Sequence, residues 1–303
     1  MRTAYLGTSE FAATVLRRLA DSPHRPSLVV TPPDRPRGRG RRLAAPPAAA
    51  AAAELDLTLY QTESVNRPES VQTLGAARPD AVAVCAFGQL ITEPLLSEYL
   101  MLNVHPSLIP RWRGAAPIER ALMAGDNHTG VTIMRVTEGL DAGPVAIQEQ
   151  IEIGDGDDYG SLSERLAELG GEVLVASLDR LAEGSPEFTE QDESQATYAE
   201  KIRPEERHLD PARPAPELER RVRALNPQVG THLELDGNER LGVRAARAVD
   251  DGPAAGEIAS RGGELLLGCV DGALRLDLVQ PPGRRPMPAA DYLRGHPLPS
   301  RAV

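Results

Sequence analysis

The chain is poor in aromatic side chains, cysteine and lysine. Phe, Trp and Tyr make up 3% of its 303 residues, Lys201 is its only lysine, and Cys85 and Cys269 are its only cysteines. Two cysteines this far apart do not make a disulfide framework, and they offer little to a thiolate metal cage. We therefore expect free thiols, no metal centre and a cytoplasmic protein.

Signals for membranes and for dinucleotides are also missing. No run of about 18 uncharged apolar residues predicts a membrane span. Strand-like residues follow Met1 directly, where a secretory signal would place a basic and then an apolar region. Gly7 closes the first predicted strand without the G-x-G-x-x-G pattern, so a tight turn is its simpler interpretation. We expect neither a membrane partner nor a dinucleotide.

Positive charge is scarce and unevenly distributed. The formal net charge of −11 argues against a general nucleic-acid binder, which needs clustered positive charge. Residues 207–303 hold 14 Arg against 13 acidic residues, whereas residues 1–206 hold 19 basic against 31 acidic residues. The acidic part nevertheless contains a run of five arginines, Arg35, Arg37, Arg39, Arg41 and Arg42. Pro and Gly between them predict an exposed loop, either merely solvated or, as we favour, in contact with phosphate.

Strand-like and helix-like segments alternate through the first half of the chain. Strands are expected near 2–6, 27–30, 58–60, 80–87, 101–105, 129–136 and 145–153, and a long helix near 161–181. The continuous apolar run AVAVCAF is typical of a central parallel strand covered on both faces. We predict an α/β fold with a doubly wound, mostly parallel, Rossmann-like sheet, whose ligands belong at the carboxyl ends of strands.

The C-terminal part has a different pattern. Five short strand-like runs separated by glycine turns lie between 231 and 281 and predict a small, closed or part-closed, OB-like β-barrel. The expected domains are 1–190, a linker at 191–206 and the barrel at 207–303. Such barrels often stack bases on aromatic side chains, but Tyr292 is the only Phe, Trp or Tyr from 207 onward. Contacts to a phosphate backbone, or simply a face of paired charges, are the remaining interpretations of its arginines, Arg220, Arg221, Arg223, Arg244, Arg247, Arg284 and Arg285 among them.

The run from 101 to 141 carries the most informative side chains. Asn103 and His105 are two residues apart in a predicted strand, so they share one of its faces. Asp141 lies in the glycine-flanked turn GLDAG. An amide for an oxyanion, an imidazole for proton transfer and a carboxylate to orient the imidazole suffice for acyl transfer. No activated Ser or Cys is evident, which favours direct transfer to an external nucleophile. Taken alone, His105 is more simply a structural histidine.

Longer motifs point to a family. NVHPSLIP at 103–110 resembles the signature of the 10-formyltetrahydrofolate-dependent formyltransferases, which several enzymes of that family share. RWRGAAPIERALMAGD at 111–126 resembles the members that formylate methionyl-tRNA. So do GTSEFA at 7–12, PDRPRGRGRRL at 33–43, GVTIM at 130–134, GLDAG at 139–143 and TYAEKI at 197–202. The likeness covers about residues 3–230 and is looser in the predicted barrel.

This resemblance implies formyl transfer from 10-formyltetrahydrofolate to the α-amino group of initiator methionyl-tRNA, for translation initiation. It implies catalysis by Asn103, His105 and Asp141. It also implies a folate site along Ser107, Leu108, Ile109 and Pro110, and a tRNA-contacting loop in which Arg39 is the functional arginine. Ile109 stands where the family often has Leu, an exchange that conserves volume. The predicted protein is a monomer whose barrel also contacts tRNA.

Two other functions stay open. The same scaffold can formylate a small amine, such as a purine precursor or an amino sugar, although the arginine loop and the second domain argue against it. A non-catalytic RNA-binding module is the alternative of another class, and the intact Asn103, His105 and Asp141 argue against that.

Overall fold

The computed structural model describes residues 1–37, 42–184, 187–236 and 239–302, and the chain forms two compact units. Unit 1 comprises Met1–Pro117, His128–Glu152 and Ser163–Ala199. Unit 2 comprises Ile118–Asn127, Ile153–Leu162 and Glu200–Val303. Unit 2 therefore includes two short segments that come before its main part in the sequence.

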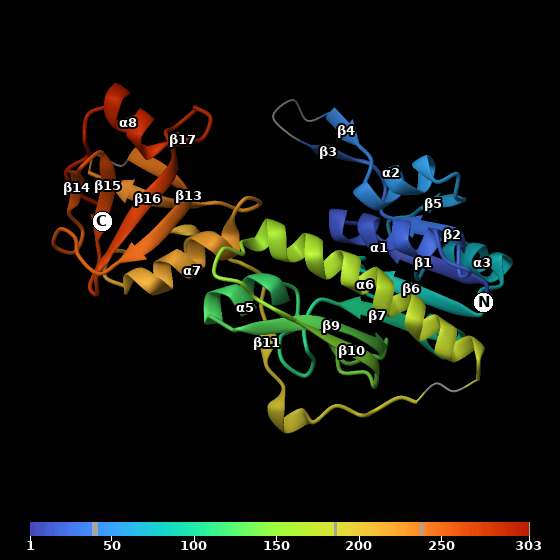
Figure 1. Cartoon of the computed structure of the whole chain (residues 1–303). Helices are drawn as coiled ribbons and strands as arrows, with labels where there is room; N and C mark the ends of the chain where they lie inside the picture. Colours follow the sequence, from blue (N-terminus) through green and yellow to red (C-terminus); the bar gives the residue numbers. More distant parts are fainter. Residues whose placement is uncertain (38–41, 185–186, 237–238, 303) are drawn as a thin grey trace. The chain divides into compact units, whose positions relative to one another are not determined.

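Unit 1 is built on a seven-stranded sheet in the order β10-β9-β7-β6-β1-β2-β5 (Figure 1). Its parallel strands are β1 (Thr3–Gly7), β2 (Pro26–Thr31), β5 (Leu59–Gln61), β6 (Ala81–Cys85) and β7 (Met101–His105). β9 (His128–Arg135) pairs antiparallel with β7, and β10 (Val145–Glu152) pairs antiparallel with β9. All residues of β1 and β6 are buried, as their continuous apolar sequences predict. The predicted doubly wound, mostly parallel sheet is confirmed.

Helices cover both faces of this sheet because side chains alternate along its strands. Leu6 of β1 joins a core with residues of α3 (Pro68–Ala77) and α4 (Leu95–Glu98). Tyr5 points the other way and donates its hydroxyl to a carbonyl of α1 (Glu10–Ala20). α1 also packs against α2 (Pro47–Glu54), and Ser9 caps its first turn by accepting from the Ala12 amide.

The long helix α6 (Tyr159–Ala182) packs closely on β7. A Cβ added at Gly170 would lie 2.9 Å from Cγ1 of Val104, so the helix needs a residue without a side chain there. Alternation then sends Asn103 and His105 out of β7 on the face opposite Val104. The packing of α6 thus leaves the other face of β7 to the polar residues.

Two short ladders lie outside the main sheet. β3 (Arg35–Arg37) and β4 (Arg42–Ala44) pair antiparallel, so the arginine-rich segment has strand arms where the sequence predicted a loop. Pro and Gly exclude a helix there, but an edge strand tolerates Pro36. β8 (Arg113–Gly114) pairs in parallel with β11 (Tyr198–Ala199), which is far away in sequence. Such two-residue pairings leave no periodic pattern to detect.

Unit 2 contains an antiparallel sheet in the order β12-β13-β16-β15-β14, with β17 beside β16. The strands are β12 (Thr231–Leu235), β13 (Glu239–Val249), β14 (Ile258–Arg261), β15 (Glu264–Gly268), β16 (Ala273–Gln280) and β17 (Met287–Pro288). The five predicted strands are all present, whereas the sequence did not predict β17 or α8 (Ala289–Gly295). Bridges from Ala302 to Leu235 and from Arg301 to Glu257 connect the chain's last described residues to both outer parts of the sheet.

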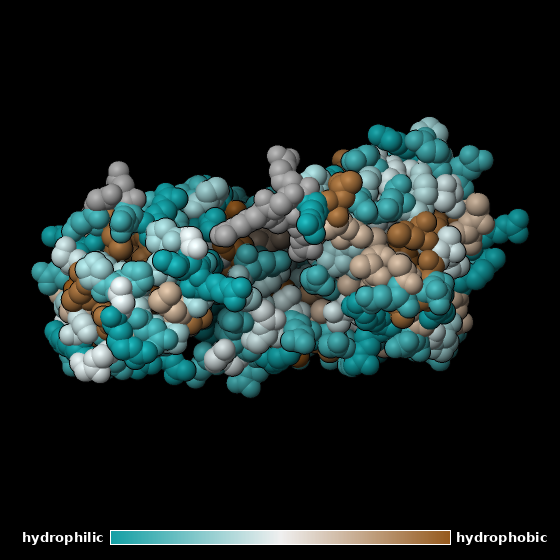
Figure 2. Space-filling view, turned by 90° about the horizontal axis from the view of Figure 1, so that it is seen from above, coloured by the Kyte–Doolittle hydropathy of each residue, from teal (hydrophilic) through white to brown (hydrophobic). Residues whose placement is uncertain are grey.

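Alternating burial builds the core of unit 2. Leu233, Val243, Leu265 and Leu276 are buried from different strands of the sheet, and α7 (Ala215–Leu225) contributes residues such as Leu218 to the same cluster. α5 (Pro117–Ala124) belongs to this unit from its second residue onward. The view in Figure 2 shows mostly hydrophilic residues with scattered hydrophobic ones. Within the described residues, every helix is too short or too polar to span a membrane.

Candidate active site

The carboxyl end of β7 presents the two polar side chains that the sequence placed together. β7 lies between β6 and β9, with Asn103 opposite Val84 on one side and His105 opposite Thr132 on the other. The His105 side chain is only 5% exposed, and Asn103 is partly buried. A polar pair at this position is what a doubly wound sheet offers to a ligand.

Asp141 meets both residues from the loop between β9 and β10. Its Oδ1 accepts a hydrogen bond from Nδ2 of Asn103 at 3.3 Å, and its Oδ2 lies 3.6 Å from Nδ1 of His105. Oδ2 also accepts a hydrogen bond from the backbone amide of Gly114 at 2.8 Å. The three residues of the predicted catalytic set are therefore adjacent, and hydrogen bonds from Asn103 and from Gly114 hold the carboxylate in place.

A backbone carbonyl orients the imidazole of His105. Nε2 lies 2.9 Å from the carbonyl oxygen of Trp112, and because a carbonyl can only accept, Nε2 carries the hydrogen. In the neutral ring, Nδ1 then holds the free lone pair, on the side of Asp141. The distance of 3.6 Å to Oδ2 exceeds a normal hydrogen bond, so Trp112 rather than Asp141 fixes the ring. The sequence missed this role because a backbone carbonyl has no residue-type signature.

Two residues of the site adopt left-handed backbone conformations. Trp112 has φ +64° and Asp141 has φ +48°. Such conformations cost about 1–3 kcal/mol each for residues with side chains, and they persist where neighbouring contacts enforce them. Here the amide of Trp112 donates to Oγ1 of Thr197 at 2.9 Å. The Trp112 carbonyl, which holds His105, is thus fixed by Thr197. The Asp141 carboxylate, which accepts from Asn103, is fixed by the Gly114 amide, and both contacts come from outside the loop concerned.

The predicted folate-site residues fall into two kinds. Ser107 is buried and donates its hydroxyl to the Arg111 carbonyl at 2.7 Å. Ile109 is also buried, and its amide donates to Oγ1 of Thr132 at 3.3 Å. Leu108 and Pro110 remain partly exposed. Ser107 and Ile109 therefore shape this turn, and the side chains left to contact a ligand are apolar.

Leu108 depends on a close approach to β9. A Cβ at Gly130 would lie 2.5 Å from Cδ2 of Leu108 and 2.1 Å from the Glu149 carbonyl oxygen. Any side chain at this position would displace Leu108 or break the pairing of β9 with β10. Gly130 is thus a residue that the predicted site needs, although it carries no functional group.

The arginine-rich hairpin is exposed where the structure describes it. The Arg35 side chain is 71% exposed and lies 3.5 Å from a carboxylate oxygen of Glu63. Arg42 is exposed as well, and Arg37 lies in β3. Arg39 and Arg41 lie outside the described residues. Among the described His, Cys, Asp and Glu residues, no group of three or more could hold a metal ion.

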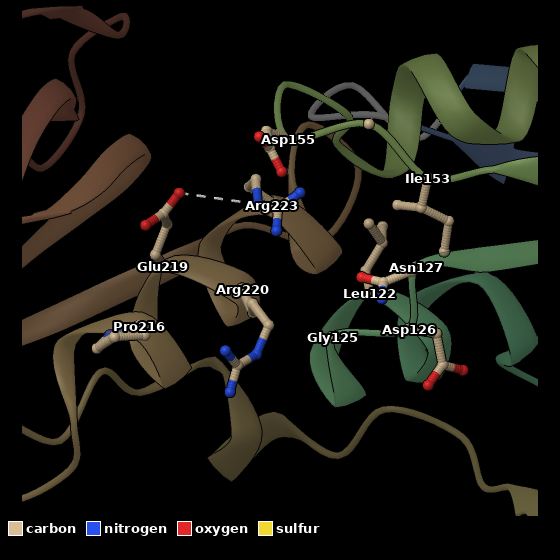
Figure 3. A pocket seen from close by; sticks show the side chains of 11 residues that line it. Leu122, Gly125, Asp126, Asn127, Ile153, Asp155, Pro216, Glu219, Arg220 and Arg223 are labelled. Carbon is tan, nitrogen blue, oxygen red and sulfur yellow. Dashed lines mark ion pairs between the residues drawn. The ribbon is translucent and has the colours of Figure 1, made fainter.

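A separate pocket of about 230 Å³ lies within unit 2 (Figure 3). Arg220 of α7 donates from Nε to the Met123 carbonyl at 3.2 Å, and Arg223 donates to the Asp157 carbonyl at 3.0 Å. These bonds attach α7 to Ile118–Asn127 and Ile153–Leu162, the two short segments of unit 2 that precede its main part. The pocket is also lined by Asp126, Asp155 and Glu219, so its positive charges are balanced and do not favour an anionic ligand.

The chain belongs to the formyl transferase family. A family model described as formyl transferase matches residues 1–178, and one described as formyl transferase, C-terminal domain, matches residues 201–297. Curated relatives include the methionyl-tRNA formyltransferases of Methylococcus capsulatus and Halorhodospira halophila. The first is 45% identical over 98% of this chain and 98% of its own length, and the second is 43% identical over 98% and 97%.

Solved structures share the fold at lower identity. HypX from Aquifex aeolicus, in complex with tetrahydrofolic acid, matches with a TM-score of 0.67 and 20% identity over 97% of this chain. The chain spans 47% of that longer structure. Glycinamide ribonucleotide transformylase 1 from Symbiobacterium toebii matches 63% of this chain and 94% of its own, with a TM-score of 0.52 and 21% identity. The fold is therefore shared beyond the full-length relatives.

Proposed function

We propose that this chain transfers the formyl group of 10-formyltetrahydrofolate to the α-amino group of initiator methionyl-tRNA. The observation that carries the proposal is the meeting of Asn103, His105 and Asp141 at the carboxyl end of β7. The relatives named methionyl-tRNA formyltransferase, similar over the whole length, support the choice of substrates. We also propose that the protein acts in the cytoplasm and as a monomer.

The three side chains have distinct proposed roles. The substrate amine, with an ordinary pKa of about 7.7, attacks the formyl carbon once it is neutral. Nδ1 of His105 holds the free lone pair and takes up a proton, and the nearby Asp141 carboxylate stabilises the resulting imidazolium. One amide hydrogen of Asn103 is bonded to Asp141, which leaves the other to stabilise the oxyanion. The bond between the formyl carbon and N10 then breaks, and the imidazolium of His105 returns its proton to N10 of the departing tetrahydrofolate.

The folate part of the proposal depends on the turn at 107–110. Leu108 and Pro110 offer apolar contact to a ring system, while the buried Ser107 and Ile109 keep the turn in place. Gln148 supports the same turn by donating to the Ile109 carbonyl at 2.5 Å. The bound folate supplies the formyl group that the reaction needs. HypX, which shares this fold and was solved in complex with tetrahydrofolic acid, supports a folate ligand at the level of fold.

The tRNA part depends on which arginines keep uncompensated charge. Many arginines of unit 2 are paired with carboxylates and are therefore poor candidates. The pairs are Arg213 with Glu217, Arg221 with Glu217, Arg240 with Glu234, Arg275 with Asp277 and Arg294 with Asp291. The partner carboxylate neutralises the charge of a paired guanidinium and competes with phosphate for its hydrogen bonds.

Arg207 and Arg244 instead bind only neutral oxygens among the described residues. Nε of Arg207 donates to the Gly230 carbonyl at 3.0 Å, and Arg244 donates to Oε1 of Gln280 at 2.6 and 2.9 Å. A Cβ at Gly230 would lie 1.6 Å from Nη1 of Arg244, so both guanidinium groups lie beside this glycine. Burial and then the charge of Arg207 lower the pKa of Arg244. Two oriented, uncompensated guanidiniums suit the oxygens of a nucleic-acid phosphate.

Salt titration of tRNA binding tests this contact. The double exchange Arg207→Gln with Arg244→Gln should weaken binding of charged initiator tRNA by about tenfold or more at low salt. Each lost phosphate contact should reduce the slope of log affinity against log salt by about 1. Arg240→Gln, which removes an exposed arginine already paired with Glu234, is the control and should leave the slope unchanged. An unchanged slope in the double variant would exclude Arg207 and Arg244 as contacts.

The activity itself is tested with three acceptors. The purified chain and 10-formyltetrahydrofolate are incubated with charged initiator tRNA, charged elongator tRNA or a small amine such as an amino sugar. Formylation of the initiator tRNA alone supports the proposal. Transfer to the small amine alone would favour a small-molecule formyltransferase, and binding of tRNA without any transfer would favour a non-catalytic RNA-binding module.

A further inference from the structure

The segment 191–199, which we call the clasp, lies in unit 1 beside the proposed catalytic residues. Its carbonyls at Thr197 and Ala199 accept hydrogen bonds from the amides of Arg113 and Ala115, at 2.9 and 2.8 Å. Oγ1 of Thr197 accepts from the amide of Trp112, whose carbonyl orients His105. The clasp therefore holds the loop that contains Trp112. The other loop beside Asn103 and His105 is the one that contains Asp141.

Gln191 extends this support to the other loop. Its Nε2 donates to the carbonyl oxygens of Asp141 at 2.9 Å and Gly143 at 2.6 Å. Its Oε1 accepts from Nε and Nη2 of Arg113, at 3.0 and 2.7 Å. Carbonyls only accept and guanidinium groups only donate, so these partners fix which end of the amide faces which loop. One side chain thus links the Asp141 loop to β8.

Arg113, which donates to Oε1 of Gln191, is itself held rigidly. The Arg113 side chain is 1% exposed, and Glu193 binds it through two hydrogen bonds of 2.7 and 2.9 Å. These bonds raise the pKa of the Arg113 guanidinium and lower that of the Glu193 carboxyl. A buried cation with this many bonds cannot move without leaving donors unsatisfied, which is costly. The amide of Gln191 is therefore fixed by a guanidinium group that cannot move easily.

We propose that Gln191 is a positioning residue that holds the Asp141 carboxylate against Asn103 and His105. Asp141 has a strained backbone at φ +48°, in a loop with glycine at 139 and 143, so the loop relaxes unless it is restrained. Gln191 binds the carbonyls of Asp141 and Gly143 and supplies that restraint. Without it, the carboxylate moves away from the groups it supports. This inference rests on the proposed formyl transfer.

The exchange Gln191→Glu separates the two ends of the side chain. It keeps an acceptor for Arg113 and replaces the donor that faces the two carbonyls with an oxygen that repels them. Gln191→Met removes both ends at similar length. The control is Gln195→Glu, the same exchange at an exposed glutamine of the clasp that bonds to Asp192 at 2.7 Å.

Steady-state formyl transfer and thermal unfolding are measured for each variant. We expect Gln191→Glu to lower kcat by about 10- to 100-fold, since a misplacement of about 1 Å costs up to about 100-fold. KM for both substrates and the unfolding temperature should stay close to those of the unsubstituted protein. Gln191→Met should lower kcat as much and also lower the unfolding temperature, and Gln195→Glu should change neither.

Three outcomes would overturn the inference. These are an unchanged kcat in Gln191→Glu, a rise in KM without a fall in kcat, and a fall in kcat that the control shares. Failure of the proposed function is a distinct result, because the unsubstituted protein would then form no formylated tRNA. Its activity is therefore measured first.

Discussion

The two units of the chain use polar side chains in opposite ways. In unit 1, Asn103, His105 and Asp141 are partly or fully buried, and their orientations depend on backbone groups such as Trp112 O and Gly114 N. In unit 2, many polar side chains are arginines near the surface, and the charge of their partners distinguishes one from another. Position decides what the first set can do, and charge balance decides what the second can do.

This difference shows which kind of site a motif can predict. Sequence patterns display the strand end that carries Asn103 and His105 and the glycine turn that carries Asp141, and the structure then brings Asp141 to the other two. They do not display the distinction between Arg240 and Arg244, because both are arginines in β13. Only the structure shows that one faces Glu234 and the other faces Gln280.

Removing the imidazole of His105 should give the largest effect on activity. It tests directly whether unit 1 performs the chemistry while other parts of the chain bind the tRNA. His105→Ala should lower kcat by about 100-fold or more, since general acid–base catalysis typically contributes that much. The affinity for charged initiator tRNA should remain within about twofold, because unit 2 and the hairpin are untouched. Single-turnover transfer and equilibrium binding measure the two quantities separately. Near-normal turnover would remove His105 from the mechanism.

A change in salt concentration should distinguish tRNA binding from catalysis without any mutation. Raising salt from 50 to 200 mM should weaken tRNA binding by about tenfold for every two phosphate contacts, because counterion release is linked to each contact. The kcat at saturating substrates should change little, since the buried groups around Asp141 are poorly screened. If kcat fell in parallel with affinity, the proposed separation of binding from chemistry would be wrong.

The two cysteines allow a finer comparison of the units. Burial raises the pKa of Cys85 in β6 to about 12 and that of Cys269 to about 11. At pH 8 the native thiolate fractions are then about 10⁻⁴ and 10⁻³, so labelling requires local opening. Single-cysteine proteins made by Cys269→Ser and Cys85→Ser should label slowly, and Cys85 more slowly because it lies in a central strand. Equal, rapid labelling of both would mean that neither thiol is buried.

The same pKa shifts predict how stability responds to alkali. In the folded state both thiols keep their protons to a higher pH than in the unfolded chain, where the pKa is about 8.5. The unfolded state therefore loses protons first as the pH rises, and the free energy of unfolding should fall above about pH 8.5. Chemical denaturation at pH 8 and pH 10 measures this decrease, which each Cys→Ser exchange should reduce.

Much of the fold was predictable because it follows from periodicity. The apolar runs of β1 and β6, the strand of Asn103 and His105, and the five main strands of unit 2 are all visible in the sequence. The ladder of β8 with β11 was not predictable, because each strand has two residues and 85 positions separate Trp112 from Thr197. The strand arms of the arginine hairpin were hidden by Pro36 and by the glycines beside them.

The candidate site was predictable only in its side chains. The motifs located Asn103, His105 and Asp141, but the Trp112 carbonyl, the Gly114 amide and Gln191 are known from the structure alone. Backbone groups belong to every residue, and Gln191 lies in a polar segment without periodicity. Left-handed backbone at Trp112 and Asp141 is likewise invisible in a sequence, because neither residue is glycine.

The clasp also sets an order of events during synthesis. Asp141 leaves the ribosome 50 residues before the glutamine that holds its carbonyl, and Trp112 leaves 85 residues before Thr197. At about 5–20 residues per second, the first interval lasts about 3–10 s. During that time the sheet can form while the loops around His105 lack their partners. A nascent chain therefore gains its transferase geometry only after residues 191–199 have been made.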